Sequence, residues 1–105
     1  MRPIKSHPDT RLAATLRADH PDFARTAGQL EDFLTCATDN GWHVLRDNKR
    51  SLFLRRQDDT VGIRQLDRGS SILSVCLRKR DLVAGVWFAS PYAPIDQIAA
   101  TVLGW

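Results

Sequence analysis

Residues 42–89 decide the fold: WHVLRDNKRSLFLRRQDDTVGIRQLDRGSSILSVCLRKRDLVAGVWFA. In this stretch, short runs rich in β-branched and aromatic residues alternate with polar clusters that contain Asp, Asn or Gly, which is typical of strands joined by tight turns. The predicted strands cover 42–46, 51–56, 60–66, 71–78 and 82–89. Because connections this short join antiparallel neighbours, the stretch predicts a five-stranded antiparallel β-meander.

Helical patterns flank the predicted sheet on both sides. The triplet His-Pro-Asp occurs at 7–9 and again at 20–22, and each copy precedes apolar residues at helical spacing. Pro is favoured at the first position of a helix and Asp complements its positive end, so both triplets indicate helix starts. The predicted helices cover about 8–18, 21–40 and 94–103.

Together these elements predict an α+β fold, with two N-terminal helices and one C-terminal helix packed mainly on one face of the meander. Residues 1–7 are expected to form a flexible arm, and residues 8–105 a single domain. Thr26 and Gln29 have the spacing of a capping box, which leaves open a start of the second helix at 27. Gly41 and Gly104 are expected to end the last two helices.

Length and charge exclude several classes of protein. The chain has 105 residues, of which 43% are hydrophobic and 26% are charged, as in globular proteins. It is too short for a TIM barrel or a full dinucleotide-binding domain. The formal net charge of +3 permits an anionic partner but does not require one.

Cysteine content and hydropathy predict a cytoplasmic protein. Cys36 and Cys76 are too few for a disulfide framework and their spacing fits no metal motif, so we expect free thiols, no metal and no cofactor. No run approaches the ~20 apolar residues that span a membrane. The first residues, MRPIKSHPDT, lack the apolar core of a signal peptide.

Alternation along the strands assigns each residue to one face of the sheet. The inner face, expected to lie under the helices, carries Val44, Leu52, Leu54, Val61, Ile63, Leu73, Val75, Leu77, Ala84, Val86 and Phe88. The outer face is expected to carry His43, Leu45, Phe53, Arg55, Arg64, Leu66, Ser74, Cys76, Arg78, Val83 and Trp87. An outer face that mixes aromatic rings with arginines is not simply polar, and it is the main indication of function.

Three interpretations of the outer face are open. The first helix or the C-terminal segment could fold over it and make a second small core. The face could be a protein interface, because aromatic residues and Arg are enriched at interface centres. It could also bind nucleic acid, with bases stacked on its aromatic rings and its arginines on phosphates.

No group of residues predicts catalysis. His43, with Asp47 nearby in sequence, is a candidate general acid or base, but a single His on a strand more often has a structural role. Asp58 and Asp59 could hold a cation, although hairpin tips carry Asp for their turn geometry. The glycines follow no phosphate-binding pattern. We therefore predict a non-enzymatic protein.

The order of elements resembles one family of small RNases. A helix followed by Gly41–Arg46, a strand at 51–56 and a final helix ending in Leu103-Gly104-Trp105 is similar to the HicA-type mRNA interferases. The resemblance implies a fold like that of double-stranded-RNA-binding domains, an RNA partner and a catalytic His on an early strand, here His43. Residues 48–52, Asn-Lys-Arg-Ser-Leu, have no His where the Gly-Ser-His motif of that family would fall.

Basic residues gather at one end of the predicted sheet. Because the turns of a meander alternate between ends, the 47–50 turn shares its end with the 67–70 turn. The predicted basic hairpin comprises Arg46, Lys49, Arg50 and Arg68.

The sequence therefore predicts a small binding module that contacts a protein partner, or a second copy of itself, through the outer face. The residues expected to bind are Phe53, Trp87, Leu45, Leu66, His43, Arg55, Arg64 and Arg78. Binding of RNA or DNA through the same face is the alternative, and a HicA-like RNase toxin is a weaker one.

Overall fold

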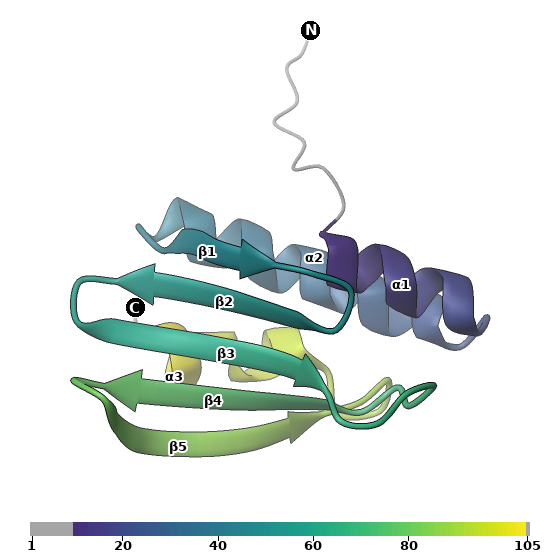
Figure 1. Cartoon of the computed structure of the whole chain (residues 1–105). Coiled ribbons are helices and arrows are strands. Elements are labelled where there is room, and N and C mark those ends of the chain that lie inside the picture. Colours follow the sequence, from purple (N-terminus) through teal and green to yellow (C-terminus); the bar gives the residue numbers. More distant parts are fainter. Residues whose placement is uncertain (1–9, 105) are drawn as a thin grey trace, which may run out of the picture.

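A computed structural model describes residues 10–104 and has the predicted α+β fold. Its elements are the helices α1 (Arg11–Asp19) and α2 (Phe23–Asp39), the strands β1 (His43–Asp47), β2 (Ser51–Arg56), β3 (Asp59–Gln65), β4 (Leu73–Lys79) and β5 (Leu82–Ala89), the 3₁₀ helix η1 (Ile95–Ile98) and the helix α3 (Ala99–Leu103). The strands lie side by side in chain order, each antiparallel to the next. In Figure 1 the helices all lie behind the sheet, so they cover one of its faces.

The helix ends follow local capping. Helix α1 begins at Arg11 because the Thr10 hydroxyl accepts a hydrogen bond from the Ala13 amide at 2.8 Å. Helix α2 begins at Phe23, directly after the second His-Pro-Asp triplet, so the alternative start at 27 is wrong. The predicted arm at 1–7 lies outside the described residues. The first helix, predicted from about 8, begins only after Thr10, whose backbone is extended.

The predicted C-terminal helix is divided. Residues 95–98 form a 3₁₀ turn, and only 99–103 are α-helical. Gly104 follows with φ +68°, and Gly41 has φ +88° after the end of α2. Both glycines adopt the left-handed conformation that ends helices, as predicted.

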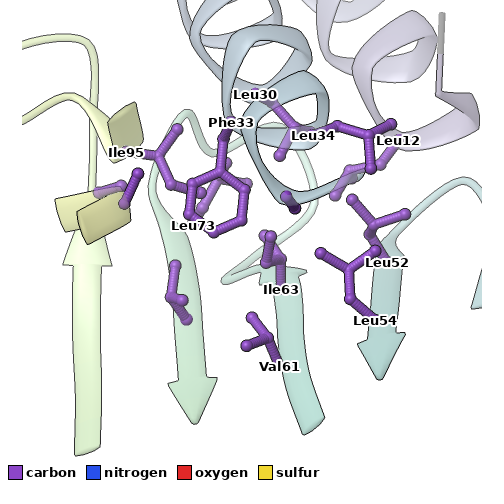
Figure 2. Packing of buried hydrophobic residues seen from close by; sticks show 14 of the residues in the cluster. Leu12, Leu30, Phe33, Leu34, Leu52, Leu54, Val61, Ile63, Leu73 and Ile95 are labelled. Carbon is purple, nitrogen blue, oxygen red and sulfur yellow. The ribbon is translucent and has the colours of Figure 1, made fainter. Parts of the chain in front are cut away.

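The core lies between the helices and the inner face of the sheet. Fully buried residues of β2, β3 and β4 meet fully buried residues of α1, α2 and η1 (Figure 2); they include Leu52, Leu54, Val61, Ile63, Leu73, Val75, Leu12, Leu30, Phe33 and Ile95. Because α1 and α3 contribute to this same core, neither covers the outer face. The interpretation of the outer face as a second core is therefore wrong for residues 10–104.

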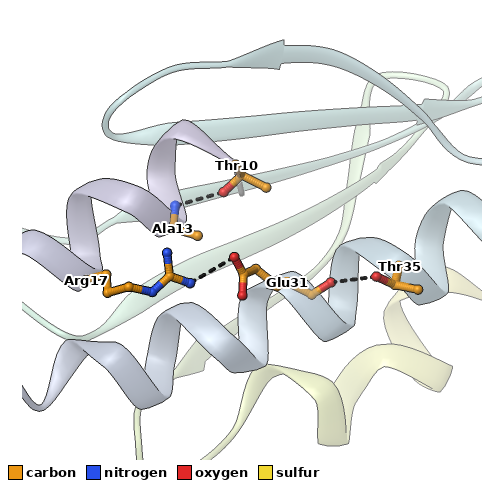
Figure 3. A network of polar contacts seen from close by, with 5 residues as sticks. All are labelled: Thr10, Ala13, Arg17, Glu31 and Thr35. Atoms are coloured by element: carbon orange, nitrogen blue, oxygen red, sulfur yellow. Dashed lines mark hydrogen bonds and ion pairs between the residues drawn. The ribbon is translucent and has the colours of Figure 1, made fainter. Parts of the chain in front are cut away.

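Polar contacts tie the helices to each other and to the sheet. Arg17 of α1 pairs with Glu31 of α2 at 2.8 Å between Nη2 and Oε2 (Figure 3). Arg56 of β2 donates to the carbonyl oxygens of Asn40 and Leu103, at 3.0 and 2.8 Å. Those carbonyls lie at the C-terminal ends of α2 and α3, where a cation is stabilising. The Arg56 guanidinium also lies 4.8 Å from the ring centroid of Trp42.

The structure corrects the face assignment in β5. Trp87 pairs with the buried Val75, so it lies on the inner face, half-buried against the core. Val86 and Phe88 lie on the outer face, with exposed fractions of 50% and 61%. The expected outer position of Trp87 and inner positions of Val86 and Phe88 are wrong. The cause is an extra residue, Ala84, which forms a bulge and shifts the alternation by one.

Candidate functional site

The outer face consists of three rows of side chains that run across the strands. The middle row passes through all five strands as Arg46, Phe53, Gly62, Cys76 and Val86. One neighbouring row contains His43, Arg55, Thr60, Arg78 and Val83. The other contains Ser51, Arg64, Ser74 and Phe88. Within residues 10–104, none of the side chains in these three rows belongs to the buried core cluster.

Phe53 lies at the centre of this face and is held from two sides. Its ring covers Gly62 so closely that a Cβ atom on Gly62 would lie 2.5 Å from Cε1 of Phe53. The Arg46 guanidinium lies 5.3 Å from the ring centroid, in the geometry of a cation–π contact. Glycine is required at position 62 because it allows this close approach. The ring is therefore half-buried, with part of it over Gly62 and the Arg46 guanidinium beside it.

The charge on this face has one sign. Its three rows contain four arginines, Arg46, Arg55, Arg64 and Arg78, and no Asp or Glu. None of the four makes an ion pair within the described part of the chain. Arg55 donates from Nε to the Gln57 carbonyl at 2.8 Å, which leaves its other N–H groups available. The face therefore offers unpaired cations to an anionic group.

A hollow of about 300 Å³ lies beside Phe53. Arg64 and Arg78 border it from opposite rows, Gly62 and Cys76 lie between them, and Phe53 and Val86 provide apolar walls. This arrangement suits a side chain that combines an apolar part with a carboxylate, because each guanidinium can donate two parallel hydrogen bonds to such a group.

The face changes from cationic to apolar toward β5. This strand contributes Val83, Val86 and Phe88 to the outer rows, and it has no charged residue. The exposed fraction of Val83 is 54%, close to that of Val86. An apolar strip therefore borders the arginine-bearing part of the face.

Two residues predicted to bind lie elsewhere than expected. Trp87 faces the core, as described above. Leu45 is the unpaired residue of a bulge in β1, between Val44 and Arg46. Leu66 follows the end of β3 and borders a small hollow with the outer-face residues Arg64 and Ser74, on the side of the sheet predicted for it. The structure brings Phe53, Arg64 and Arg78 together, while His43 and Arg55 lie in the row nearest the β2–β3 turn.

The predicted basic hairpin is divided between two surfaces. Lys49, Arg50 and Arg68 border one hollow at the sheet end, together with Thr15 and Asp19 of α1. The turns at 47–50 and 67–70 therefore share one end, as predicted. The placement of Arg46 in this cluster is wrong, because its side chain lies over Phe53 on the outer face.

The structure does not assemble the acid–base pair considered for His43. His43 pairs with Arg55 on the outer face, whereas Asp47 pairs with the buried Leu52. The Asp47 carboxylate accepts a hydrogen bond from the Arg11 amide at 2.9 Å. Among residues 10–104, no three His, Cys, Asp or Glu side chains come together as metal ligands would.

Sequence reasoning missed the residues that give this face its apolar part and its hollow. The alternation places Val86 and Phe88 on the wrong face, and Gly62 is not among the residues predicted to bind. One signal was present in the sequence. β2 and β3 are joined by a short turn, so Phe53 and Gly62 must face each other if the two strands pair in register.

Comparison of the chain with protein-family models, with curated proteins and with solved structures finds no match. Within the part of the chain that the structure describes, no helix combines the length and the apolar composition needed to cross a membrane. The function is therefore inferred from the geometry of the outer face.

Proposed function

We propose that this protein is a small non-enzymatic binding module whose outer sheet face contacts a protein partner. The observation that carries the proposal is the joint presence of an apolar strip and four unpaired arginines on a face that no described helix covers. Interfaces concentrate aromatic residues and Arg at their centres, which is the composition found here.

The state of the aromatic rings supports a protein partner over nucleic acid. Base stacking needs a free ring face. Phe53 lies between Gly62 and Arg46, and Trp87 faces the core. His43 and Phe88 have exposed rings, but they lie on the two opposite edge strands, β1 and β5, and do not form a continuous stacking surface. Binding of RNA or DNA remains the second candidate because the face carries no acid.

The charges indicate which chemistry the partner offers. A partner segment with Asp or Glu beside aliphatic or aromatic residues could place a carboxylate between Arg64 and Arg78 while covering Val86. Stacking two copies face to face would instead oppose like charges, which is destabilising. The proposed partner of this face is therefore a different, acidic and apolar protein surface.

A peptide selection tests this proposal. Peptides selected from a random display library are expected to combine Asp or Glu with apolar residues, and to shift the backbone NMR signals of β2, β3 and β4 at their outer-face residues. Arg64→Glu and Arg78→Glu are each expected to weaken binding roughly tenfold or more, equivalent to ~1.4 kcal/mol. Arg68→Glu at the sheet end is the matched control and should change binding less than twofold.

Two results would contradict the proposal. If the selected peptides instead shift the protein's NMR signals in the helices or at the Lys49–Arg50 end, the outer face is not the binding surface. A mixed single-stranded oligonucleotide pool that shifts the outer-face signals, with affinity falling steeply as salt rises, would favour nucleic acid.

A further inference from the structure

The sheet has two edge strands, β1 and β5, and β5 is the one whose sequence leaves its edge open to pairing. Strand β5 has eight residues, Leu-Val-Ala-Gly-Val-Trp-Phe-Ala, with no charge and no proline. No strand within residues 10–104 pairs with its free side. The exposed fraction of Leu82 is 74%, and Phe88 is also mostly exposed. A long, uncharged, apolar edge strand with unpaired backbone groups is a template for pairing with another strand.

The backbone groups that point to this open edge can be assigned. Arg80 and Asp81, both with positive φ, form a tight turn that places Lys79 opposite Leu82 in a hydrogen-bonded pair. Counting along the ladder through the bulge at Ala84, the N–H and C=O groups of Val86 and Phe88 point away from β4. These two residues therefore offer four unpaired backbone groups to a new strand.

The charge pattern identifies the occupant as a second copy of this chain. A strand without charges can pair with its own copy without opposing like charges, whereas the outer face, with four arginines and no acid, cannot. Antiparallel pairing of identical strands also closes on itself around a two-fold axis and leaves no open edge at the contact. This argument is independent of the function proposed for the outer face.

We propose that β5 pairs antiparallel with β5 of a second copy, with the two-fold axis at Trp87. In this register the regular stretches Gly85–Ala89 of the two copies pair with each other. Val86 of each copy then lies opposite Phe88 of the other copy. An axis at Val86 would bring the bulged Ala84 into the ladder. An axis at Phe88 would set Val86 opposite Ser90 of the second copy, whose N–H and C=O groups are already hydrogen-bonded to Ala93.

The pairing has a consequence for the outer face. The two five-stranded sheets become one continuous sheet, with the Val86 and Phe88 side chains of both copies side by side at its centre. Aromatic and β-branched residues opposite each other are favourable cross-strand pairs. The strand contact is small beside the ~1,200–2,000 Å² of stable interfaces. The pair is therefore expected to dissociate on dilution.

Sedimentation equilibrium of the full chain over a range of concentrations tests the proposal. The average mass of the wild-type protein should rise with concentration from one chain toward two. Val86→Lys should raise the dissociation constant at least tenfold, because its lysine would lie against Phe88 of the second copy. Val83→Lys is the matched control: Val83 is equally exposed on the same face but lies before the bulge, so its effect should stay within about twofold.

A disulfide tests the register. With Cys36 and Cys76 replaced by Ser, Trp87→Cys should form a disulfide between copies on mild oxidation, because directly opposed residues that are not hydrogen-bonded lie close enough for one. Circular dichroism of each variant verifies that it is folded.

Three results would overturn the proposal. A monomer at every concentration would do so, as would equal effects of Val86→Lys and Val83→Lys. A dimer abolished by Arg78→Glu but unaffected by Val86→Lys would show association through the outer face instead. Because Arg78→Glu is expected to leave the β5 pair intact, failure of this proposal and failure of the proposed function are distinguishable.

Discussion

The two edge strands of this sheet differ in how they meet solvent. Strand β1 has five residues, of which three are polar or charged (His43, Arg46 and Asp47), and it is interrupted by a bulge at Leu45. Strand β5 has eight residues and no charge. Charges, bulges and short length are the means by which proteins prevent edge strands from pairing. One edge is therefore protected by its sequence, and the other is left available for pairing.

The edges also differ in how they are anchored. Trp42, directly before β1, is 2% exposed, donates from Nε1 to the Leu103 carbonyl at 3.3 Å and lies under Arg56. Trp87 in β5 is only half-buried, with its ring over Gly85. In Figure 1, α1 and α2 lie behind the β1 side of the sheet, away from β5.

Replacing the two tryptophans gives the largest expected difference between the edges. Trp42→Ala should lower the free energy of unfolding by about 3–5 kcal/mol, because it leaves a cavity and removes one of the two hydrogen bonds to the Leu103 carbonyl. Trp87→Ala should cost about 2 kcal/mol or less in dilute protein. Urea unfolding followed by circular dichroism measures both. Equal losses would show that β5 is anchored as firmly as β1.

Arg56→Met tests how Arg56 holds the ends of α2 and α3 to the sheet. The substitution keeps an apolar stem over Trp42 but removes the hydrogen bonds to the Asn40 and Leu103 carbonyls. Hydrogen bonds from charged donors contribute about 1.5–3 kcal/mol, so a loss of that size is expected on urea unfolding. Arg55→Met, at an exposed neighbouring position with one backbone acceptor, is the control. A similar loss in both variants would contradict the role of Arg56 at the helix ends.

Asp47→Ala should have a smaller effect, about 1 kcal/mol, because it removes one hydrogen bond between the end of β1 and the first amide of α1. Asp58→Ala is a suitable control, since the Asp58 carboxylate makes only a surface contact of 4.0 Å with Arg80. Thermal unfolding of the two variants tests the difference. An equal change in melting temperature would exclude Asp47 as a specific tie between β1 and α1.

Val86→Lys should have the smallest effect on the stability of the isolated chain. Its side chain is half-exposed on the outer face, so we expect a change within about 0.5 kcal/mol in dilute protein. Urea unfolding at a concentration below the dissociation constant measures it. A loss comparable to that of Arg56→Met would mean that Val86 supports the fold of a single chain.

Much of the fold follows from local patterns. Short polar connections predict the meander, and the buried residues of β2, β3 and β4 alternate strictly with outer-face residues, so their faces are correctly predicted. In β5 both faces are apolar, and Gly85, which can mark a bulge or close packing, does not fix where the alternation shifts. A single extra residue there reverses the positions of Val86, Trp87 and Phe88.

The candidate site is less predictable because it depends on contacts between strands. Phe53, Arg64 and Arg78 follow from alternation alone. The Arg46 side chain folds over Phe53 because the bulge at Leu45 puts Arg46 opposite that ring. The outer face is open because α1 packs beside α2 on the inner face. Helical periodicity in the sequence does not determine on which face of the sheet α1 packs.

Amide hydrogen exchange at two protein concentrations tests the difference between the edges most directly. The Val86 and Phe88 amides point to the open edge, so we expect their exchange to slow as the protein concentration rises. The amides of His43–Asp47 in β1 should exchange at an unchanged rate. Exchange at β5 that is independent of concentration, or protection that increases at β1 instead, would contradict this expectation.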